Sequence, residues 1–268
     1  MKASGIITLL TDFGLSDPYA AMIKGVILSI NPGARIVDIT HQIDRGSIHQ
    51  AARIIRETYR YFPERTVHLA VVDPGVGSDR RLIALEADGH LFVGPDNGLF
   101  WPVIEVNGPA TVVQLTESRF FLPDVTHTFH GRDVFAPVAA YLSLGTDVHS
   151  LGREITDAIK ITFPSPCCRE GMLWGQIIRV DHFGNLITNI EAEELSRYLG
   201  TAQPVIHVGQ LTVEGLGRIY ADVEEGRPMA LINSSGLLEI AVNMGKASDY
   251  VGIERGEIQG SAVLVKKS

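Results

Sequence analysis

The sequence predicts an α/β fold in two parts: an N-terminal domain with a mainly parallel sheet and a smaller, mostly antiparallel C-terminal domain. Three observations favour this division. Short apolar runs alternate with segments of helical periodicity up to about residue 160. A proline-rich stretch, 163–166, follows and resembles a linker. Beyond it, short alternating runs are separated by glycine-containing turns, which is typical of antiparallel sheets. We therefore expect domains at 1–163 and 170–268.

Apolar runs rich in branched residues predict the first three strands, at Ile6–Leu10, Arg35–Ile39 and Val67–Val72. An apolar stripe from Tyr19 to Ile30 predicts a helix between the first two, with Asp17 as its cap and Pro18 at its first position. Strand, helix and strand in succession imply parallel pairing through crossover helices.

Three further elements complete the prediction. A second helix is expected to start at Ser47, and Asp88-Gly89 predicts a hairpin that makes the sheet mixed. A third helix is expected over Val134–Leu144. In the C-terminal part only Ala192–Tyr198 and Lys246–Val251 have helical character.

Composition narrows the classes of partner and location. The chain has 268 residues and a formal net charge of −8, which argues against nucleic acid or an anionic membrane as a partner. No run reaches the roughly 20 apolar residues of a membrane span, and the first residues lack a signal-peptide pattern. The two cysteines, Cys167 and Cys168, are adjacent and suit a reducing compartment. We expect a cytoplasmic protein.

Polar, mostly glycine-containing turns follow four of the apolar runs. In open α/β sheets ligands bind at the carboxyl ends of the strands, so these turns are expected to carry the chemistry. The turns are Thr11-Asp12-Phe13-Gly14, Thr40-His41, Asp73–Arg80 and Gly94–Gly98.

Two carboxylates in the first turn are candidate ligand contacts. Each carboxylate has two acceptor oxygens and can bind both hydroxyls of a ribose diol. Asp12 lies at the strand end, which favours ligand contact, although a turn-stabilising role is the alternative. For Asp17, a role as helix cap explains its position as well as contact with a ligand does.

Asp73 and Arg80 are spaced to form an ion pair across their turn. A guanidinium would fix the orientation of the carboxylate, which makes Asp73 a candidate for positioning a water molecule. A purely structural bridge has the same sequence pattern.

Four residues of types that bind metals recur at three-residue spacing, namely Asp124, His127, His130 and Asp133. A metal site is one interpretation. The alternative is a turn that enters the next helix, with His130 near the N-terminus of that helix. In the second domain, the segment Asp181–Asn189 combines a carboxylate, an aromatic ring and amides that could bind a nucleobase.

Five of these segments together resemble one family, the S-adenosyl-L-methionine (SAM) hydroxide adenosyltransferases, which are relatives of the SAM-dependent fluorinase and chlorinase. The segments, in order along the chain, are Thr11-Asp12-Phe13-Gly14, Asp73-Pro74-Gly75-Val76-Gly77, Gly94-Pro95-Asp96-Asn97-Gly98, Phe129-His130-Gly131-Arg132-Asp133 and Asp181-His182-Phe183-Gly184-Asn185.

The resemblance implies an N-terminal α/β sandwich, a smaller C-terminal antiparallel β-barrel and a homotrimer with active sites at subunit interfaces. It also implies hydrolysis of SAM to adenosine and L-methionine by in-line attack of water or hydroxide at C5′, with no cofactor and no metal. By the same resemblance the catalytic residues are Asp73, Arg80 and His130. The implied substrate-binding residues are Asp12, Asp17, Asn97, Asp181, Phe183, Asn185 and Ser234.

Departures from the halogenases favour water over halide. Those relatives carry a Tyr followed by Ser or Gly where this chain has His130-Gly131, and they are altered near the Asp73 turn, whereas this chain keeps Asp73 and Arg80. Ser235 and Val242 replace halogenase arginines, which leaves methionine recognition open. Two alternatives remain: a metal-dependent hydrolase that uses His127 and His130, and a non-catalytic adenosine or SAM sensor.

Overall fold

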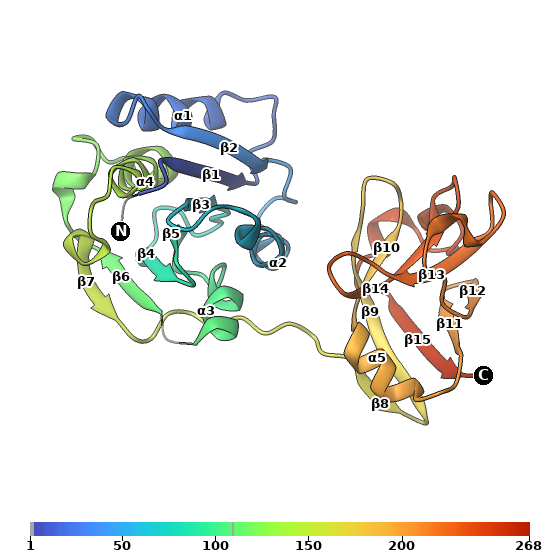
Figure 1. Ribbon diagram of the computed structural model, residues 1–268. Helices are drawn as coiled ribbons and strands as arrows, with labels where there is room; N and C mark the ends of the chain where they lie inside the picture. Colours follow the sequence, from blue (N-terminus) through green and yellow to red (C-terminus); the bar gives the residue numbers. More distant parts are fainter. Residues whose placement is uncertain (1–2, 109) are drawn as a thin grey trace. The chain divides into compact units, whose positions relative to one another are not determined.

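The computed structural model describes residues 3–108 and 110–268, and the chain forms two compact units, Met1–Thr162 and Phe163–Ser268 (Figure 1). No helix in the described residues is both long enough and apolar enough to cross a membrane. Cys167 and Cys168 are both free thiols.

Within the described residues, the first unit has a seven-stranded sheet in the order β2-β1-β3-β5-β4-β6-β7. Strands β2, β1, β3 and β5 pair in parallel, and β4, β6 and β7 continue the sheet through antiparallel pairs. Five strands therefore run in one direction, and the Asp88-Gly89 hairpin joins β4 to β5 as predicted. The strands are β1 (Ile6–Thr11), β2 (Arg35–Thr40), β3 (Val67–Val71), β4 (Leu82–Ala87), β5 (His90–Pro95), β6 (Thr111–Leu115) and β7 (Gly152–Ile155).

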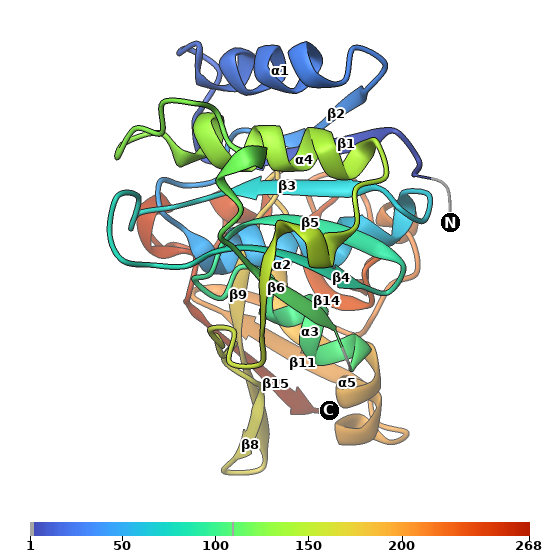
Figure 2. The same cartoon turned by 90° about the vertical axis from the view of Figure 1, so that its left-hand side faces the viewer.

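Helices cover both faces of this sheet, as Figure 2 shows. Helices α1 (Tyr19–Ile30) and α4 (Ala136–Ser143) pack on one face, and α2 (Ile48–Thr58) and α3 (Trp101–Asn107) on the other. Successive strand residues point to opposite faces, so Leu9 joins the first core and Leu10 the second. Burial on both faces explains why the sequences of these strands are continuous apolar runs. The predicted α/β sandwich is confirmed.

The second unit is an antiparallel sheet in the order β12-β11-β15-β9-β10-β14-β13, with β8 paired to β9. The two ends of this order, β12 and β13, lie against each other, so the sheet curls into a nearly closed barrel around one apolar core. Its elements are β8 (Cys167–Arg169), β9 (Met172–Val180), β10 (Leu186–Glu191), α5 (Ala192–Leu199), β11 (Pro204–Val208), β12 (Leu211–Glu214), β13 (Pro228–Ile232), β14 (Leu237–Val242) and β15 (Ala262–Lys267).

Three local expectations differ from the structure. Pro18, not Asp17, is the residue that caps α1, and no side chain caps that end. The helix expected over Val134–Leu144 begins earlier, as a π-helical turn at Gly131–Phe135 that leads into α4. The helix expected over Lys246–Val251 is a single 3₁₀ turn, Ala247–Asp249.

Candidate active site

The carboxyl ends of four parallel strands meet at one edge of the first sheet. Thr11 at the end of β1 pairs with Val71 at the end of β3, and Leu10 pairs with Thr40 at the end of β2. Because β5 runs parallel to β3, its end lies at the same edge. The turns that carry Asp12, His41, Asp73 and Asn97 therefore leave the sheet side by side.

Asp73, Arg80 and His130 are in direct contact at this edge. Arg80 Nε donates to Asp73 Oδ1 at 2.5 Å, and Arg80 Nη2 donates to Asp73 Oδ2 in the second arm of a bidentate pair. The same Nη2 lies 3.1 Å from His130 Nδ1. The side chains of Asp73 and Arg80 are only 5% and 9% exposed, so the pair is largely screened from solvent.

The contact with Arg80 fixes the protonation state of the His130 ring. A guanidinium can only donate, so Nδ1 must accept, and the neutral ring carries its proton on Nε2. Burial, with the charge of Arg80 second, lowers the pKa of His130 below its ordinary value of 6.5. His130 therefore presents an N–H donor, on Nε2, at neutral pH.

Gly77 allows the Asp73–Arg80 turn to approach the segment that precedes His130. Its φ is +80°, in the region that favours glycine, and a Cβ there would lie 2.4 Å from the carbonyl oxygen of His127. No other residue type would allow the two backbones to pack this closely. The glycine thus brings two segments together that are 50 residues apart in the sequence.

Asp12 is held by the loop that follows β2. Its Oδ2 accepts a hydrogen bond from the backbone N–H of Gly46 at 2.8 Å. A Cβ built on Gly46 would lie 3.7 Å from the Pro74 side chain, so this loop also borders the Asp73 turn. Asp17 is exposed on the loop before α1.

Asn97 is tied to the end of β3 through its amide. Its Nδ2 donates to the carbonyl of Val72 at 2.9 Å, and its Oδ1 accepts from the N–H of Leu99. This side chain braces the strand end directly before Asp73.

In the second unit, Asp181 and Asn185 close a tight turn between β9 and β10. Asp181 Oδ1 accepts from the backbone N–H of Asn185 at 2.8 Å, and Oδ2 accepts from its amide at 3.2 Å. Phe183 at the tip of the turn is 71% exposed, an unusual position for a large aromatic side chain. Ser234 is exposed in the turn before β14, where Asn233 accepts two backbone hydrogen bonds.

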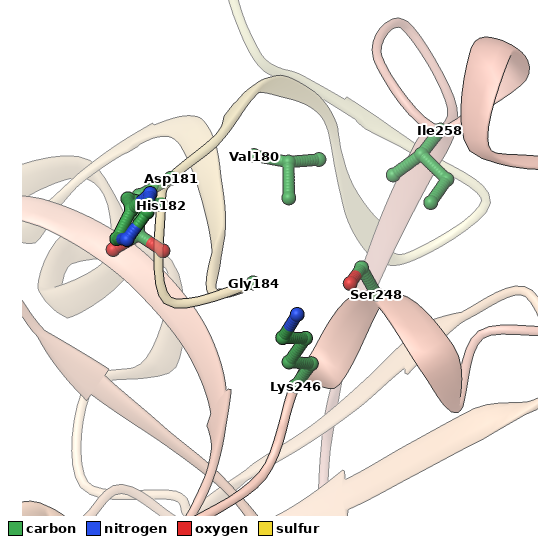
Figure 3. A pocket seen from close by; sticks show the side chains of 7 residues that line it. All are labelled: Val180, Asp181, His182, Gly184, Lys246, Ser248 and Ile258. Carbon is green, nitrogen blue, oxygen red and sulfur yellow. The ribbon is translucent and has the colours of Figure 1, made fainter.

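A pocket of about 260 Å³ lies beside this turn (Figure 3). Lys246 and Ser248 extend their polar atoms into it from the segment after β14. The backbone of Ser248 donates to the carbonyl of Gly184, which fixes that segment against the turn. The lining residues are Val180, Asp181, His182, Gly184, Lys246, Ser248 and Ile258.

Both halves of the chain match domain profiles of one family. The SAM hydroxide adenosyltransferase N-terminal domain matches residues 7–152, and the C-terminal domain matches residues 175–258. The chain belongs to the SAM hydroxide adenosyltransferase family.

Relatives in this family align over nearly the whole chain. A protein of Salinispora arenicola named (R)-S-adenosyl-L-methionine hydrolase is 36% identical over 96% of this chain and 97% of its own. A fluorinase of Actinoplanes sp. is 31% identical over 91% and 93%. The crystal structure of a conserved protein from Thermotoga maritima has a TM-score of 0.89 at 32% identity and covers 97% of this chain and 100% of its own.

In this family member, hydrogen bonds already engage the carboxylate at the end of the Asp124–Asp133 segment. Asp133 is fully buried and accepts from the backbone and side chain of Thr126 and from Arg132. Burial alone would raise the pKa of Asp133, but these hydrogen bonds outweigh it and lower the pKa. Across residues 3–108 and 110–268, no three His, Cys, Asp or Glu side chains are grouped to hold a metal ion.

Two polar contacts near the site residues were not predicted from the sequence. His41 hydrogen bonds to Thr11, next to Asp12, although its position after a strand was visible in the sequence. In the second unit Tyr220 donates to the buried Glu239 at 2.7 Å. Burial and this carboxylate raise the pKa of Tyr220 to about 12. No local pattern marks that second pair, because its members come from a 3₁₀ turn, Tyr220–Asp222, and from β14, and they are 19 residues apart.

Proposed function

We propose that this chain hydrolyses S-adenosyl-L-methionine to adenosine and L-methionine. The observation that carries the proposal is the contact of Asp73, Arg80 and His130 at the strand edge, in a member of this family. Four relatives that align over 93–96% of the chain at 36–38% identity bear the name (R)-S-adenosyl-L-methionine hydrolase. We include the (R) configuration at sulfur in the proposed substrate.

The reaction is an in-line displacement at C5′ of the ribose. The oxygen of water forms a bond to C5′, the C5′–S bond breaks, and its electron pair returns to sulfur. The sulfonium becomes a neutral thioether, and one proton from the water is released. Because the leaving group is neutral, no acid is needed to protonate it. Holding water in line behind C5′ can lower the barrier by up to about 7–11 kcal/mol.

Each of the three catalytic residues has a distinct role in this scheme. His130 donates from Nε2 to the oxygen of the attacking water and so orients its lone pairs. Asp73 is the acceptor for the proton that the water loses, through lone pairs not engaged by Arg80. Arg80 holds both partners, since its Nε and Nη2 bind the carboxylate and Nη2 also reaches His130. Arg80 thereby acts on the water through its neighbours.

Substrate binding is divided between the two units in this proposal. Asp12 binds the ribose hydroxyls, with Asp17 and Asn97 near the same edge. Asp181, Phe183, Asn185 and Ser234 bind the adenine and the methionine portion. The exposed ring of Phe183 offers a stacking surface for a base, which supports this assignment.

We further propose a homotrimer whose active sites lie at subunit interfaces. The exposed side chains of Leu15, Tyr19 and Met22 support it, because they lie close in sequence to Asp12 and Asp17, just before or in the first turn of α1, and are 41–71% exposed in the single chain. The proposed enzyme needs no cofactor and no metal, because the sulfonium already activates its carbon. Its two free cysteines fit a cytoplasmic location.

Chromatography of SAM incubated with the purified protein tests the function directly. We expect adenosine and methionine in equal amounts, with ¹⁸O from labelled water in the 5′-hydroxyl group of adenosine. Binding without turnover would make the protein a sensor instead. Activity lost on dialysis against a chelator and restored by zinc would favour a metal-dependent hydrolase.

A further inference from the structure

We infer that His41 is a positioning residue that orients Asp12 and so sets the affinity for the nucleoside, an inference that rests on the proposed function. Four contacts join the loop after β2 to the turn after β1. Thr11 Oγ1 lies 2.8 Å from His41 Nδ1, and the N–H of Gly14 donates to the carbonyl of His41 at 2.7 Å. The N–H of Ile43 reaches the carbonyl of Thr11 at 3.4 Å, and Gly46 binds the Asp12 carboxylate.

The side chain of His41 links the buried Thr11 to the exposed Asp38. The backbone N–H of Phe13 donates to Thr11 Oγ1 at 3.3 Å, which leaves the Thr11 hydroxyl free to donate to His41 Nδ1. The opposite ring nitrogen, Nε2, lies 3.1 Å from Asp38 Oδ1, off the line of a straight hydrogen bond. Asp38 in turn accepts from Lys24 at 2.6 Å.

A threonine, a histidine and an aspartate in a row resemble a nucleophilic triad in composition, but the burial of the threonine excludes that role. Thr11 is fully buried and His41 is 3% exposed. A nucleophile must reach its substrate, so this hydroxyl cannot act as one. What the chain of contacts can do is fix the backbone on either side of Thr11.

The geometry at the end of β2 aims His41 at this position. The register between β1 and β2 shifts between Leu9 and Leu10, so β2 carries one extra residue immediately before Thr40. Such irregularities re-aim the side chains that follow them. Asp12 Oδ2 is held by Gly46, whereas Oδ1 has no hydrogen-bond partner among the described residues and is available to a ligand. The orientation of that free oxygen depends on the loop that His41 anchors.

Substitution of His41 tests this role through affinity. For His41→Leu we expect the dissociation constant of adenosine, measured by calorimetry, and the KM for SAM to rise about tenfold, with kcat within about threefold of wild type. His41→Asn, whose amide oxygen can still accept from Thr11, should recover much of the affinity. Should His41→Leu not fold, Thr11→Val, with a side chain of nearly the same shape, removes this hydrogen bond together with the one from the Phe13 N–H.

A second buried threonine–histidine pair, between β1 and β3, supplies a matched control. Thr8 Oγ1 and His68 Nδ1 are also 2.8 Å apart and fully buried, but they lie in the middle of the sheet. His68→Leu should therefore lower the melting temperature and leave adenosine affinity unchanged. An adenosine affinity within about twofold of wild type in His41→Leu, or an equal loss in His68→Leu, would overturn the positioning role while wild-type hydrolysis still stands. A wild-type protein that binds neither adenosine nor SAM would refute both proposals.

Discussion

Arg80 forms hydrogen bonds with both Asp73 and His130. We therefore expect a substitution at any one of the three to remove the catalytic contribution of all three. Asp73→Asn and His130→Ala should each lower kcat by about 10²–10⁴-fold, because positioned proton acceptors and donors act mainly in the transition state. The KM for SAM should change only a few-fold. Arg80→Lys should also be damaging, since an ammonium cannot reproduce the bidentate contact.

Steady-state kinetics on these variants, with the exposed Asp79→Asn of the same turn as control, checks this expectation. A double variant of Asp73 and His130 should be scarcely worse than either single one. Full activity in Asp73→Asn would contradict a catalytic role for the Asp73–Arg80 turn and leave it a structural one.

The lowered pKa of His130 predicts the pH range of activity at the same scale. Burial disfavours the charged ring, so the neutral form, with its Nε2 donor, persists below the ordinary pKa of 6.5. We expect the acid limb of the kcat profile to lie below pH 6.5, with activity falling as the ring becomes protonated. A midpoint above pH 6.5 would contradict this assignment, and the limb should be absent from the residual activity of His130→Ala.

At the scale of elements, the approach of the Asp73–Arg80 turn to the His127 carbonyl depends on Gly77. Gly77→Ala adds both an unfavourable φ and a Cβ that would lie 2.4 Å from that oxygen. Gly145→Ala is the matched control, because Gly145 also has a positive φ but no atom within 4 Å of its added Cβ. We expect the control to cost about 1 kcal/mol of unfolding free energy and to keep its activity. Gly77→Ala should lose more stability and most of its kcat, as chemical denaturation and kinetics would report.

The pairing of β1, β3 and β5 includes a buried chain of side chains, Thr8, His68 and His90, that makes stability depend on pH. Burial lowers the pKa of His68 to about 3, whereas the unfolded chain has the ordinary value of 6.5. The unfolded state therefore binds more protons between these two values. This stabilisation is complete above pH 6.5 and falls by up to about 1.4 kcal/mol per pH unit below it. Denaturation curves from pH 7 to pH 4 should show the decline, and His68→Leu should flatten it.

At the scale of the whole molecule, the proposed trimer can be tested by mass and by complementation. Sedimentation should give three times the chain mass of 29.2 kDa. If each active site combines the first unit of one chain with the second unit of another, mixed trimers of Asp73→Asn and Asp181→Asn should regain intact sites. Neither variant alone should be active. A monomer with full activity, or mixtures that stay inactive, would exclude shared sites.

The sequence predicted most of the first unit, because residues adjacent in the sequence mark the strands and turns of that unit. Apolar runs closed by polar turns marked β1, β2 and β3, and the Asp88-Gly89 pair marked the hairpin. It did not predict α3, β6 or β7, which are short and lack strong caps or periodicity. Periodicity alone did not show that the sheet of the second unit closes, because β12 and β13, which meet there, follow one another in the sequence but lie at opposite ends of the strand order.

For the site, residue types at strand ends identified Asp73 and Arg80 as a pair, but not the contact of Arg80 with His130. That contact spans 50 residues and depends on the close approach at Gly77. The metal interpretation of Asp133 finds no support for a related reason. The four Asp and His residues match common metal ligands, but the sequence could not show that Thr126 and Arg132 already bind the Asp133 carboxylate.

The hydrogen bond from Arg80 to His130 Nδ1 also decides how the proton of each turnover leaves. A histidine relays protons by taking one on one ring nitrogen and releasing another from the other. Here Nδ1 faces a guanidinium, which does not give up its protons, so nothing can be passed through the ring in that direction. The imidazole can donate a hydrogen bond to the water but cannot relay a proton. In the proposed reaction, the proton released by hydrolysis therefore leaves on the carboxylate side of the site, through Asp73 or directly to solvent, and we expect a buffer molecule to alter the rate only from that side.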